Sequence, residues 1–398
     1  MIGKAVGVVA EYNPFHNGHA VHIARTREML DMPVIAIMSG HFTQRGDAAV
    51  QRKHVRAEAA VRCGVDLVLE LPLPFAAAGA EYFAFGAVSL LAATGVVGHI
   101  SFSSEYGDAK LLAAYAHRLM DGDLQTAIKS IYDSGVCYPV ARQRAVERAG
   151  MDGKILISPN NILGIEYIKA LRALGSPITP VSFKREGAAH DQAGTDGSIA
   201  SASHIRSLLL AGEHEKAAKY MPPQVMELYR AEMRDGRAPV SLENDQRGVI
   251  SYLRRLSSED FSQVADATEG LGDRIASAVR QCCTLRAIYD TAKTKRYTHS
   301  RIRRIVLCAY LGLYVSSRPA APPYIRPLAF NDTGRALLAD MRIKSAVPVL
   351  TRPAGPYVTD QARELMLTEA RATDLCNAAA PAYRPAGEEF RLPPVYIR

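Results

Sequence analysis

The sequence predicts an α/β fold, in which a doubly wound parallel sheet is followed by a mainly α-helical C-terminal domain. Three observations carry this prediction. Apolar runs of strand length alternate with helix-like segments through residues 1–220, which predicts parallel strands joined by crossover helices. Beyond residue 220 the apolar residues recur at helical spacing instead. In addition, polar clusters follow several of the strands in the first half.

The first half opens on Ala5-Val6-Gly7-Val8-Val9, an apolar run that predicts a fully buried strand. Four further runs predict strands because they are short, apolar and bounded by turn residues; they cover residues 33–38, 65–71, 99–105 and 178–183. The segments between them predict helices at 19–30, 49–63, 80–94 and 161–174, and a further helix that ends at 210.

The second half predicts helices at 225–233, 246–256, 271–289 and 300–313, where apolar residues follow a helical period. We place the boundary near Tyr220-Met221-Pro222-Pro223, which gives a catalytic domain over 1–220 and a helical domain over 221–398. The tail after Ala380 is rich in proline and arginine. We expect it to be either loosely ordered or packed along another surface.

Composition indicates a soluble globular protein with room for two hydrophobic cores, since 48% of the 398 residues are apolar and 22% are charged. The apolar runs are too short or too interrupted to span a bilayer, and the N-terminus enters a predicted strand directly, so we expect no signal peptide and no membrane partner. The six cysteines show no CxxC spacing. We expect free thiols in a reducing cytoplasm.

Charge is divided unevenly along the chain. Residues 1–220 hold 22 Lys and Arg against 21 Asp and Glu, whereas residues 221–398 hold 26 against 19. Ten of the eleven histidines precede residue 220. The chemistry is therefore expected in the first half and affinity for a polyanion in the second. Alternatively, the excess of arginine in the second half could simply belong to an ordinary solvated protein surface.

The candidate site begins at Glu11-Tyr12-Asn13-Pro14-Phe15-His16-Asn17-Gly18-His19, with His22 three residues later. This stretch lies between a predicted strand and a predicted helix, an arrangement that presents free backbone N–H groups to an anion. Further polar clusters follow other strands at 39–45, 103–105 and 184–185. Ligands of parallel sheets collect at the carboxyl ends of strands, so we expect these clusters to meet.

The histidines of this stretch allow three interpretations. Neutral imidazoles at His16 and His19 could donate hydrogen bonds to oxygens that gain charge at an α-phosphate. Alternatively, His16, His19 and His22 could bind zinc, although no cysteine lies near them and no HExxH pattern is present. The third interpretation is a capped helix start with incidental histidines. We favour the phosphate site, with no metal bound by the protein.

Other residues fit the same chemistry. Arg185, and Arg206 in the first turn of a serine-rich helix start, suit the charge on a departing pyrophosphate, because guanidinium groups pair bidentately with phosphate. Asn161 opens a predicted helix and could contact adenine or ribose, or could simply cap that helix. Residues 291–304 contain six basic residues and no acid, with Tyr297 and His299 interleaved. This segment indicates a polyanion-binding surface, or else a solvated basic helix start.

Two motifs resemble a known superfamily. Phe15-His16-Asn17-Gly18-His19 is similar to the HxGH signature of the nucleotidyltransferase superfamily, which includes class I aminoacyl-tRNA synthetases. Ser201-Ala202-Ser203-His204-Ile205-Arg206 resembles its second motif. Longer blocks resemble the tRNA(Met) cytidine acetate ligase family over nearly the whole chain. These blocks are 11–19, Met38-Ser39-Gly40-His41-Phe42, Gln44-Arg45-Gly46, Val65-Asp66-Leu67-Val68-Leu69-Glu70-Leu71-Pro72, Ser158-Pro159-Asn160-Asn161-Ile162-Leu163-Gly164-Ile165-Glu166-Tyr167, Lys293-Thr294-Lys295-Arg296-Tyr297-Thr298 and Tyr324-Ile325-Arg326.

The resemblance implies a Rossmann-like nucleotidyltransferase domain and an ATP-dependent ligase. Such an enzyme activates acetate as acetyl-adenylate, with Mg²⁺ accompanying ATP, and acetylates N4 of the wobble cytidine of elongator tRNA(Met). The implied catalytic residues are His16, His19 and Arg206. The implied ATP-binding residues are Val9, Ala10, Glu11, Tyr12, Asn13, Pro14, Phe15, His16, Asn17, Gly18, His19, His22, Ser103, Asn160, Asn161 and Arg185. Ser103 stands where the family usually has glycine.

The second domain is then the tRNA-binding part, and its basic segment supplies the implied contacts Lys293, Lys295, Arg296, Arg301, Arg303 and Arg304. Two other functions remain open from the sequence. One is a small-molecule adenylyltransferase of coenzyme biosynthesis, and the other is a non-catalytic RNA-binding protein that kept a nucleotide fold. The sequence carries no signal for the oligomeric state.

Overall fold

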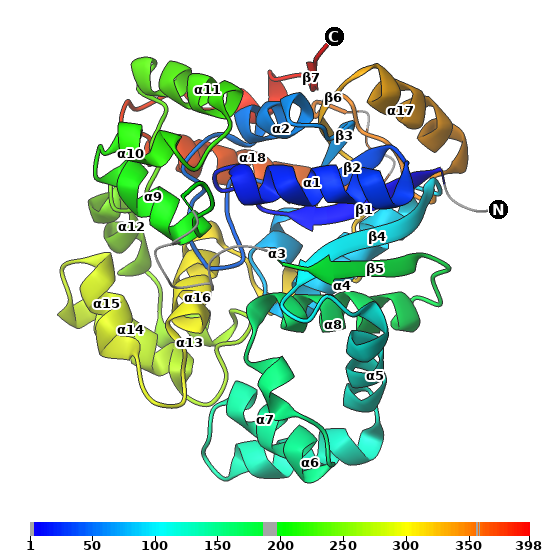
Figure 1. The fold of residues 1–398 in the computed structure, drawn as a ribbon. Coiled ribbons are helices and arrows are strands. Elements are labelled where there is room, and N and C mark those ends of the chain that lie inside the picture. Colours follow the sequence, from blue (N-terminus) through cyan, green and yellow to red (C-terminus); the bar gives the residue numbers. More distant parts are fainter. Residues whose placement is uncertain (1–3, 186–196, 356, 358) are drawn as a thin grey trace.

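The computed structural model describes residues 4–185, 197–355, 357 and 359–398. The segment at 186–196, which follows Arg185 in the predicted site, lies outside the described residues. The described part of the chain forms one seven-stranded sheet in the order β5-β4-β1-β2-β3-β6-β7 (Figure 1). Its strands are β1 (Ala5–Ala10), β2 (Val34–Ser39), β3 (Leu67–Leu71), β4 (Val97–Ser104), β5 (Thr179–Lys184), β6 (Pro327–Phe330) and β7 (Val395–Tyr396).

The predicted doubly wound parallel sheet is confirmed for β1 to β5, which pair in parallel with their neighbours. Helices α1 (Asn17–Leu30) and α2 (Lys53–Arg62) lie on one side of this sheet, and α4 (Ala80–Ala93) and α8 (Pro159–Ala173) lie on the other (Figure 1). Side chains of β1 alternate between the two faces. Val6 and Val8 join the core under the first pair of helices, and Ala5 joins the core under the second.

Close packing of α4 on the sheet requires a glycine in β1. A Cβ built on Gly7 would lie 2.5 Å from Cδ2 of Leu91, a buried residue of α4. The short helix α3 (Leu73–Ala76) precedes α4, and its Phe75 stacks on Tyr82 with ring centroids 4.5 Å apart. The first half of the chain thus builds a sheet covered on both faces, as parallel sheets require.

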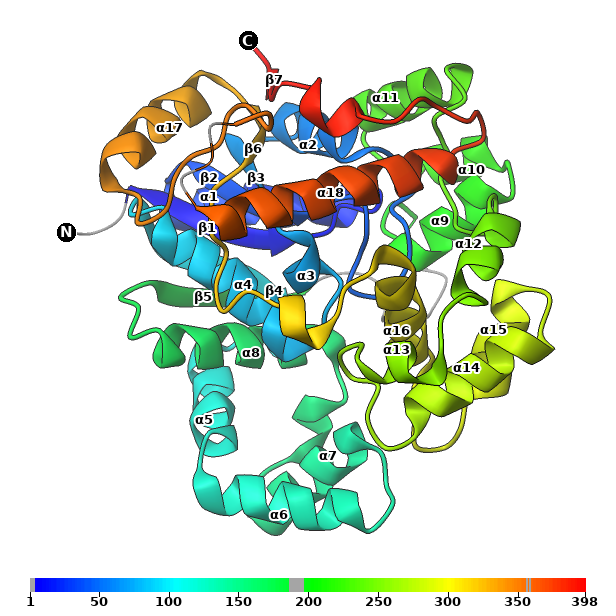
Figure 2. The same cartoon turned by 180° about the vertical axis from the view of Figure 1, so that it is seen from behind.

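A helical lobe between β4 and α8 was not predicted from the sequence. It consists of α5 (Ala109–Leu119), α6 (Gly122–Asp133), α7 (Tyr138–Arg148) and a 3₁₀ turn, Gly153–Leu156. In Figure 2 the lobe extends from α8 away from the sheet. Its helices bury their own apolar residues, among them Leu124, Ile128 and Val146, which continue the core beneath α8.

The remainder of the chain is largely helical, as predicted, with one correction. A single helix over 271–289 is wrong, because the chain leaves the helix at Cys282 and a new helix starts after Thr284, whose Oγ1 accepts the N–H of Ala287. The helices are α9 (Ala202–Leu210), α10 (His214–Ala218), α11 (Pro223–Arg234), α12 (Gln246–Leu253), α13 (Ser258–Ser262), α14 (Leu271–Gln281), α15 (Leu285–Ala292), α16 (His299–Leu311), α17 (Asp332–Lys344) and α18 (Asp360–Ala378).

Two strands from the second half extend the sheet of the first. β6 pairs antiparallel with β3, and β7 pairs with β6, so the tail after Ala380 packs along the sheet and is not loosely ordered. The division into domains at residue 220 stays a prediction, and any such boundary must allow for these strands. None of the helices in the described ranges is both long and apolar enough to cross a bilayer.

A buried network of ion pairs fastens the end of the chain to this sheet. Lys53 Nζ lies 2.6 Å from a carboxylate oxygen of Glu70 and 2.6 Å from one of Glu389. Arg326 pairs with the same two carboxylates, at 3.0 Å from Glu70. All four side chains are at most 2% exposed. Because removing one member of such a group leaves a buried charge uncompensated, the network strongly specifies how the tail docks.

Arg56 of α2 holds together the loops that leave the first two strands. Its fully buried guanidinium donates to the backbone oxygens of Gln51 and Ser39, each at 3.1 Å, and also to those of Glu11 and Gly40. Four carbonyl groups that strand ends and loops would otherwise leave buried and unpaired are thereby satisfied.

We expect Arg56→Met to lower the free energy of unfolding by at least ~3 kcal/mol, because each buried polar group left without a partner costs ~1–3 kcal/mol. The measurement is urea denaturation followed by circular dichroism. Arg62→Met on the same helix is the matched control: Arg62 is exposed and pairs with Glu58 one turn earlier, so a change within ~0.5 kcal/mol is expected. Equal losses for the two variants would contradict the role given to Arg56.

Candidate active site

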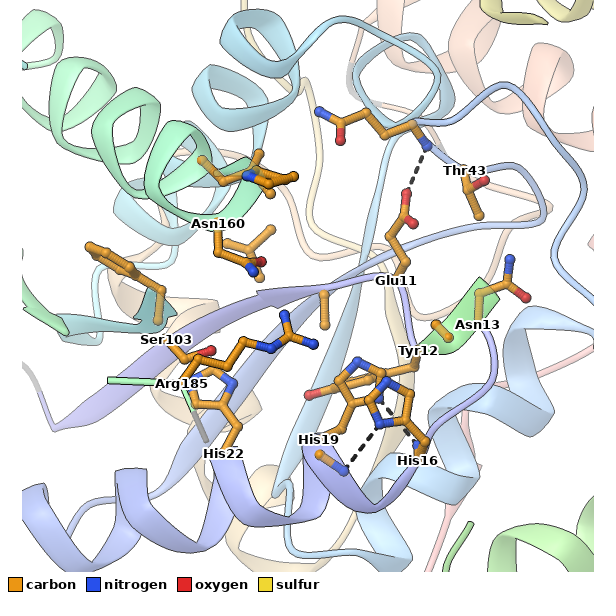
Figure 3. A pocket seen from close by; sticks show the side chains of 18 of the residues that line it. Glu11, Tyr12, Asn13, His16, His19, His22, Thr43, Ser103, Asn160 and Arg185 are labelled. Carbon is orange, nitrogen blue, oxygen red and sulfur yellow. Dashed lines mark hydrogen bonds between the residues drawn. The ribbon is translucent and has the colours of Figure 1, made fainter. Parts of the chain in front are cut away.

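A pocket of about 570 Å³ opens at the carboxyl ends of the parallel strands (Figure 3). This volume is typical of small-molecule sites. The pocket borders β1 and its neighbour β4, whose connections leave toward opposite faces of the sheet, and such a switch point is where open α/β sheets bind ligands. The expected meeting of the polar clusters is confirmed, since the residues that line the pocket include Asn13, His19, Thr43, Ser103 and Arg185.

His16 and His19 form the first turn of α1 and stack on each other, with ring centroids 3.7 Å apart. His16 is the N-cap residue: its Nδ1 accepts the backbone N–H of Gly18 at 3.1 Å. In return, Nδ1 of His19 accepts the backbone N–H of His16 at 3.2 Å. The dashed lines in Figure 3 mark these bonds. The pair therefore caps the helix start and is also oriented by it.

These hydrogen bonds decide where each ring carries its proton. A neutral imidazole whose Nδ1 accepts a hydrogen bond must carry its hydrogen on Nε2. His16 and His19 both accept at Nδ1, so both keep an Nε2–H as a donor. Among the described residues, Nε2 of His22 is buried without any hydrogen-bond partner. Two oriented donors and a third uncommitted nitrogen thus line one wall of the pocket.

The imidazoles of the site are neutral near pH 7. Burial, with Arg185 and Arg206 adding positive charge nearby, lowers the pKa of His16 from 6.5 to about 3. Burial and Arg185 lower the pKa of His22 to about 4. The pKa of His19 is also lowered well below its usual value, first by burial and then by the repulsion that would arise if His16 were protonated beside it, with Arg185 adding to the effect. The site thus combines neutral donors with fixed cations.

Gly18 is favoured by the position of the His16 ring. A Cβ at residue 18 would lie 3.0 Å from Cε1 of His16 and 3.1 Å from its Nδ1, so the ring would have to shift by a few tenths of an ångström to accept a side chain there. The glycine of the HxGH pattern is thus explained by close approach of a side chain to the backbone.

The two predicted arginines reach the pocket from different elements. Arg185 follows β5, where its N–H donates to the carbonyl of Ser104, and Arg206 lies on α9, where its Nη1 donates to the carbonyl of Asn13 at 2.8 Å. Partial burial lowers the pKa of both guanidinium groups. Beside them, Ser103 of β4 lies opposite Phe183 of β5 in the register of the sheet, at the edge of the pocket.

The neighbouring asparagines of α8 have different positions. Asn160 lines the pocket and donates to Glu105 at 2.8 Å. Asn161 is fully buried: its Oδ1 accepts the N–H of Glu105, and its Nδ2 donates to the carbonyl of Ile155. The interpretation of Asn161 as a helix cap is wrong, because Ser158 is the N-cap of α8. The structure places Asn160 on the pocket and Asn161 behind it.

Other predicted ATP-binding residues lie just outside the pocket. Phe15 and Pro14 are buried in the loop, and Asn17 Nδ2 donates to the carbonyls of Ser198 and Lys219. These three residues shape the turn that carries His16. The remaining members of the loop set line the pocket directly, namely Val9, Ala10, Glu11, Tyr12, Asn13, His16, Gly18, His19 and His22.

Only one residue of the predicted basic segment lines the pocket, namely Arg303, whose Nη1 lies 3.5 Å from Asp47. Arg296 pairs with Glu269, and Arg301 donates to the carbonyl of Asp266. Arg304 donates to the carbonyl of Gln44, and Lys293 and Lys295 are exposed.

The loop after β2 supplies pocket residues that were not assigned from the sequence, namely Thr43, Gln44, Arg45 and Asp47. The N–H of Gln44 donates to Glu11 at 2.7 Å. Gly46 has φ +77°, and a Cβ there would lie 2.4 Å from the backbone nitrogen of Arg304, so the loop packs against α16. The sequence signal that could have indicated these residues was the Gln44-Arg45-Gly46 block. It predicts a tight turn, but it does not indicate that the turn lies against the pocket. Arg25, Lys184, Tyr167 and Phe183 also line the pocket.

A metal centre built by the protein was the alternative for the histidines. Within the described ranges, no group of three or more His, Cys, Asp or Glu side chains is arranged to hold a metal ion. The two acids of the pocket among these residues are Glu11 and Asp47.

Comparisons with known proteins agree over the whole chain. The model of the family described as HIGH Nucleotidyl Transferase matches residues 3–389. A protein of Acetivibrio thermocellus named tRNA(Met) cytidine acetate ligase is 37% identical over 97% of this chain and 98% of its own length. A protein of the same name from Thermotoga maritima is 38% identical over 86% of this chain and 85% of its own.

Solved structures are similar to the same extent. The crystal structure of apo Thermotoga maritima TmcAL superposes with a TM-score of 0.94 at 34% sequence identity, covering 99% of this chain and all of that one. The structure of the same protein bound with alpha-thio ATP superposes with a TM-score of 0.92, at the same identity and coverage.

We expect the imidazole of His16 to stay neutral from pH 8 to about pH 5, because its pKa is lowered to about 3. NMR of ¹³Cε1-labelled histidine, with the His16 resonance assigned by its loss in His16→Asn, measures this directly. In the urea-unfolded chain, the control, imidazoles titrate near 6.5. The unfolded chain therefore binds more protons below pH 6.5, and these histidines make the folded state less stable as pH falls. A His16 inflection near 6.5 in the folded protein would contradict the assignment.

Proposed function

The chain belongs to the HIGH nucleotidyl transferases and, within them, to the tRNA(Met) cytidine acetate ligases. On this premise we propose that it activates acetate with ATP and then acetylates N4 of the wobble cytidine of elongator tRNA(Met). The observation that carries the proposal is the pair of neutral, stacked imidazoles at the start of α1. Two guanidinium groups, those of Arg185 and Arg206, line the same pocket at the strand ends and act on the His16 ring through their charge.

In the first step an acetate oxygen attacks the α-phosphorus of ATP, and the bond from that phosphorus to pyrophosphate breaks. Charge grows on the α-phosphate oxygens, and we propose that the Nε2–H groups of His16 and His19 donate to them. Donors already oriented by the helix start need no rearrangement as the charge develops. Neutral imidazoles keep this role across the physiological pH range, because the lowered pKa of each ring prevents it from gaining a second proton, while its Nε2–H stays in place.

Arg206 and Arg185 stabilise the pyrophosphate and the nucleotide by charge-assisted hydrogen bonds. Arg206 is held beside the imidazoles through Asn13, and Ser201 caps the helix that carries it, so phosphate oxygens there would also meet the positive end of the α9 dipole. Asn160 and Ser103 line the pocket beyond Arg185 and His22 in Figure 3, and we assign this part to the nucleoside.

In the second step N4 of the cytidine attacks the acetyl carbon, and the bond from that carbon to the AMP oxygen breaks. The amine loses a proton as the amide forms. We propose Glu11 as the acceptor, because its carboxylate lines the pocket and is held by the N–H of Gln44. AMP leaves with the electrons of the broken bond.

Mg²⁺ would enter with the nucleotide. This ion keeps several waters and binds through substrate phosphates more often than through cages of protein ligands, which agrees with a pocket holding two acids among its described residues. When bound, it would neutralise phosphate charge. That acetate is the acid substrate is inferred from the family, whose members are named acetate ligases. The tRNA substrate and the free cysteines support the cytoplasm as the place of action.

We expect His19→Ala to slow pyrophosphate release from ATP and acetate about a hundredfold, because loss of one transition-state donor costs ~3 kcal/mol. The assay follows pyrophosphate by a coupled enzyme reaction, and circular dichroism checks the fold. His117→Ala on α5, an exposed histidine outside the pocket, is the control and is expected to match wild type. Near-normal release by His19→Ala would refute the role of the imidazole pair.

The exposed lysines test tRNA binding more cleanly than Arg303, because Arg303 also lines the nucleotide pocket. We expect the double variant Lys293→Glu, Lys295→Glu to bind tRNA more than tenfold more weakly, and the slope of log affinity against log salt to fall by about two. Filter binding at several salt concentrations measures both. ATP affinity is expected to be unchanged. The double variant Arg342→Glu, Lys344→Glu at the end of α17, where both side chains are exposed, is the charge-matched control, and an equal effect there would rule out a local RNA contact.

A further inference from the structure

Four side chains outside the nucleotide site form a continuous stack, which we call the Tyr–Arg ladder: Arg296, Tyr132, Tyr138 and Arg142. The guanidinium carbon of Arg296 lies 5.0 Å from the ring centroid of Tyr132. The rings of Tyr132 and Tyr138 meet edge to face at 6.0 Å, and the guanidinium carbon of Arg142 lies 5.8 Å from the ring centroid of Tyr138. Two adjacent rings thus lie between two cations in one chain of contacts.

The ladder joins the helical lobe to the basic segment. Tyr132 lies in α6, and Tyr138 and Arg142 lie in α7, whereas Arg296 belongs to the segment between α15 and α16. Neither the lobe nor these tyrosines had a part in the functional assignments made from the sequence. The contact with Arg296 bridges parts of the chain that are far apart in sequence, and Figure 2 shows the lobe beside the C-terminal helices.

The ladder also contacts α8, the helix whose first turn lines the pocket. Arg142 Nη2 pairs with Glu166 of α8 at 3.0 Å, and the first turn of α8 lines the pocket with Pro159 and Asn160. The Tyr138 hydroxyl is close enough to Glu81 for that charge to affect its pKa. Glu81 follows Ala80, another residue of the pocket lining.

The burial of the tyrosines argues against a purely structural role. Tyr138 is 42% exposed, and it does not belong to the hydrophobic core, although Tyr132 packs against that core. A brace that only fastened the lobe would be expected to bury its rings, because an aromatic side chain stabilises mainly through the apolar area it removes from water.

The chemistry of the proposed reaction explains why one ring of the ladder, that of Tyr138, is exposed, while the Arg142 side chain beside it is only 12% exposed. An enzyme that acts on a base within a strand must take that base out of its stack, and its neighbours then lose a stacking partner. Aromatic rings and guanidinium planes are the groups on which proteins stack unpaired RNA bases. We propose that the Tyr–Arg ladder is the platform on which the nucleotides flanking the acceptor cytidine stack, in a single-stranded RNA loop. This inference rests on the proposed function.

The test compares Tyr138→Ala with Tyr138→Phe and with a matched tyrosine elsewhere. Tyr396 of β7 is 39% exposed, contacts the ring of Phe330 at 5.5 Å and has the guanidinium carbon of Arg335 at 5.6 Å. Like Tyr138 it has one ring and one guanidinium beside it, although its hydroxyl also donates to Asp332, and β7, which carries it, lies at the opposite end of the molecule from α7 in Figure 1. Tyr396→Ala therefore removes an equivalent ring away from the pocket.

The probes are the anticodon stem-loop of tRNA(Met) and a fully paired RNA duplex of equal length, with binding measured by fluorescence anisotropy. We expect Tyr138→Ala to bind the stem-loop about tenfold more weakly, the effect of losing one stacked base, and the duplex within twofold of wild type. Tyr138→Phe and Tyr396→Ala are expected to match wild type on both probes. Pyrophosphate release from ATP and acetate is expected to stay within twofold in all three variants.

Three results for Tyr138→Ala would overturn the ladder as a stacking platform. The first two are unchanged binding of the stem-loop and equal weakening of binding to stem-loop and duplex. The third is loss of pyrophosphate release together with RNA binding, which would indicate that the ladder only stabilises the fold. Failure of the proposed function would look different. In that case even the wild-type protein would neither bind nor acetylate the stem-loop. The inference about the ladder would then be refuted together with the proposed function.

Discussion

The guanidinium of Arg56 is the contact on which the geometry of the pocket depends. It binds carbonyl groups from the ends of β1 and β2 and from the loop before α2, and its side chain is fully buried. Parallel strands end with unpaired backbone groups, and a buried loop with unpaired carbonyls would be unstable. By satisfying several of them with one side chain, Arg56 allows the loops after β1 and β2 to lie side by side. The bond from Gln44 to Glu11 and the placement of His16 both follow from that arrangement.

The electrostatics of the site follow from burial. Arginine keeps its charge when partly buried, whereas histidine gives up its proton, so the same environment yields cations at Arg185 and Arg206 and neutral donors at His16 and His19. A phosphate therefore meets fixed positive charge on one side and hydrogen-bond donors on the other. The helix start adds its own dipole and at the same time determines which ring nitrogen keeps the hydrogen.

Contacts distant in sequence join the nucleotide pocket to the parts assigned to RNA. Gly46 packs against the backbone of α16 at Arg304, so the loop that holds Glu11 also touches the basic helix. Arg326 and Glu389 bring the end of the chain onto Lys53 and Glu70. Arg296 reaches the helical lobe through Tyr132. The pocket is thus bordered by the loop after β2 and by the basic segment, and the lobe in turn contacts the basic segment.

The sequence by itself determined the parallel sheet, the strand-to-helix turn with its histidines, and the meeting of polar clusters, because local apolar period and strand order are enough to specify them. Only the tertiary structure decided which of Asn160 and Asn161 faces the pocket, since one turn of α8 carries both. It also decided that β6 and β7 extend the sheet, because strands of four and two residues have too short a pattern to recognise. The break at Cys282 and the lobe of α5 to α7 depend on packing against distant helices. Such contacts leave no mark on the spacing of nearby residues, which is why the Tyr–Arg ladder appears only in three dimensions.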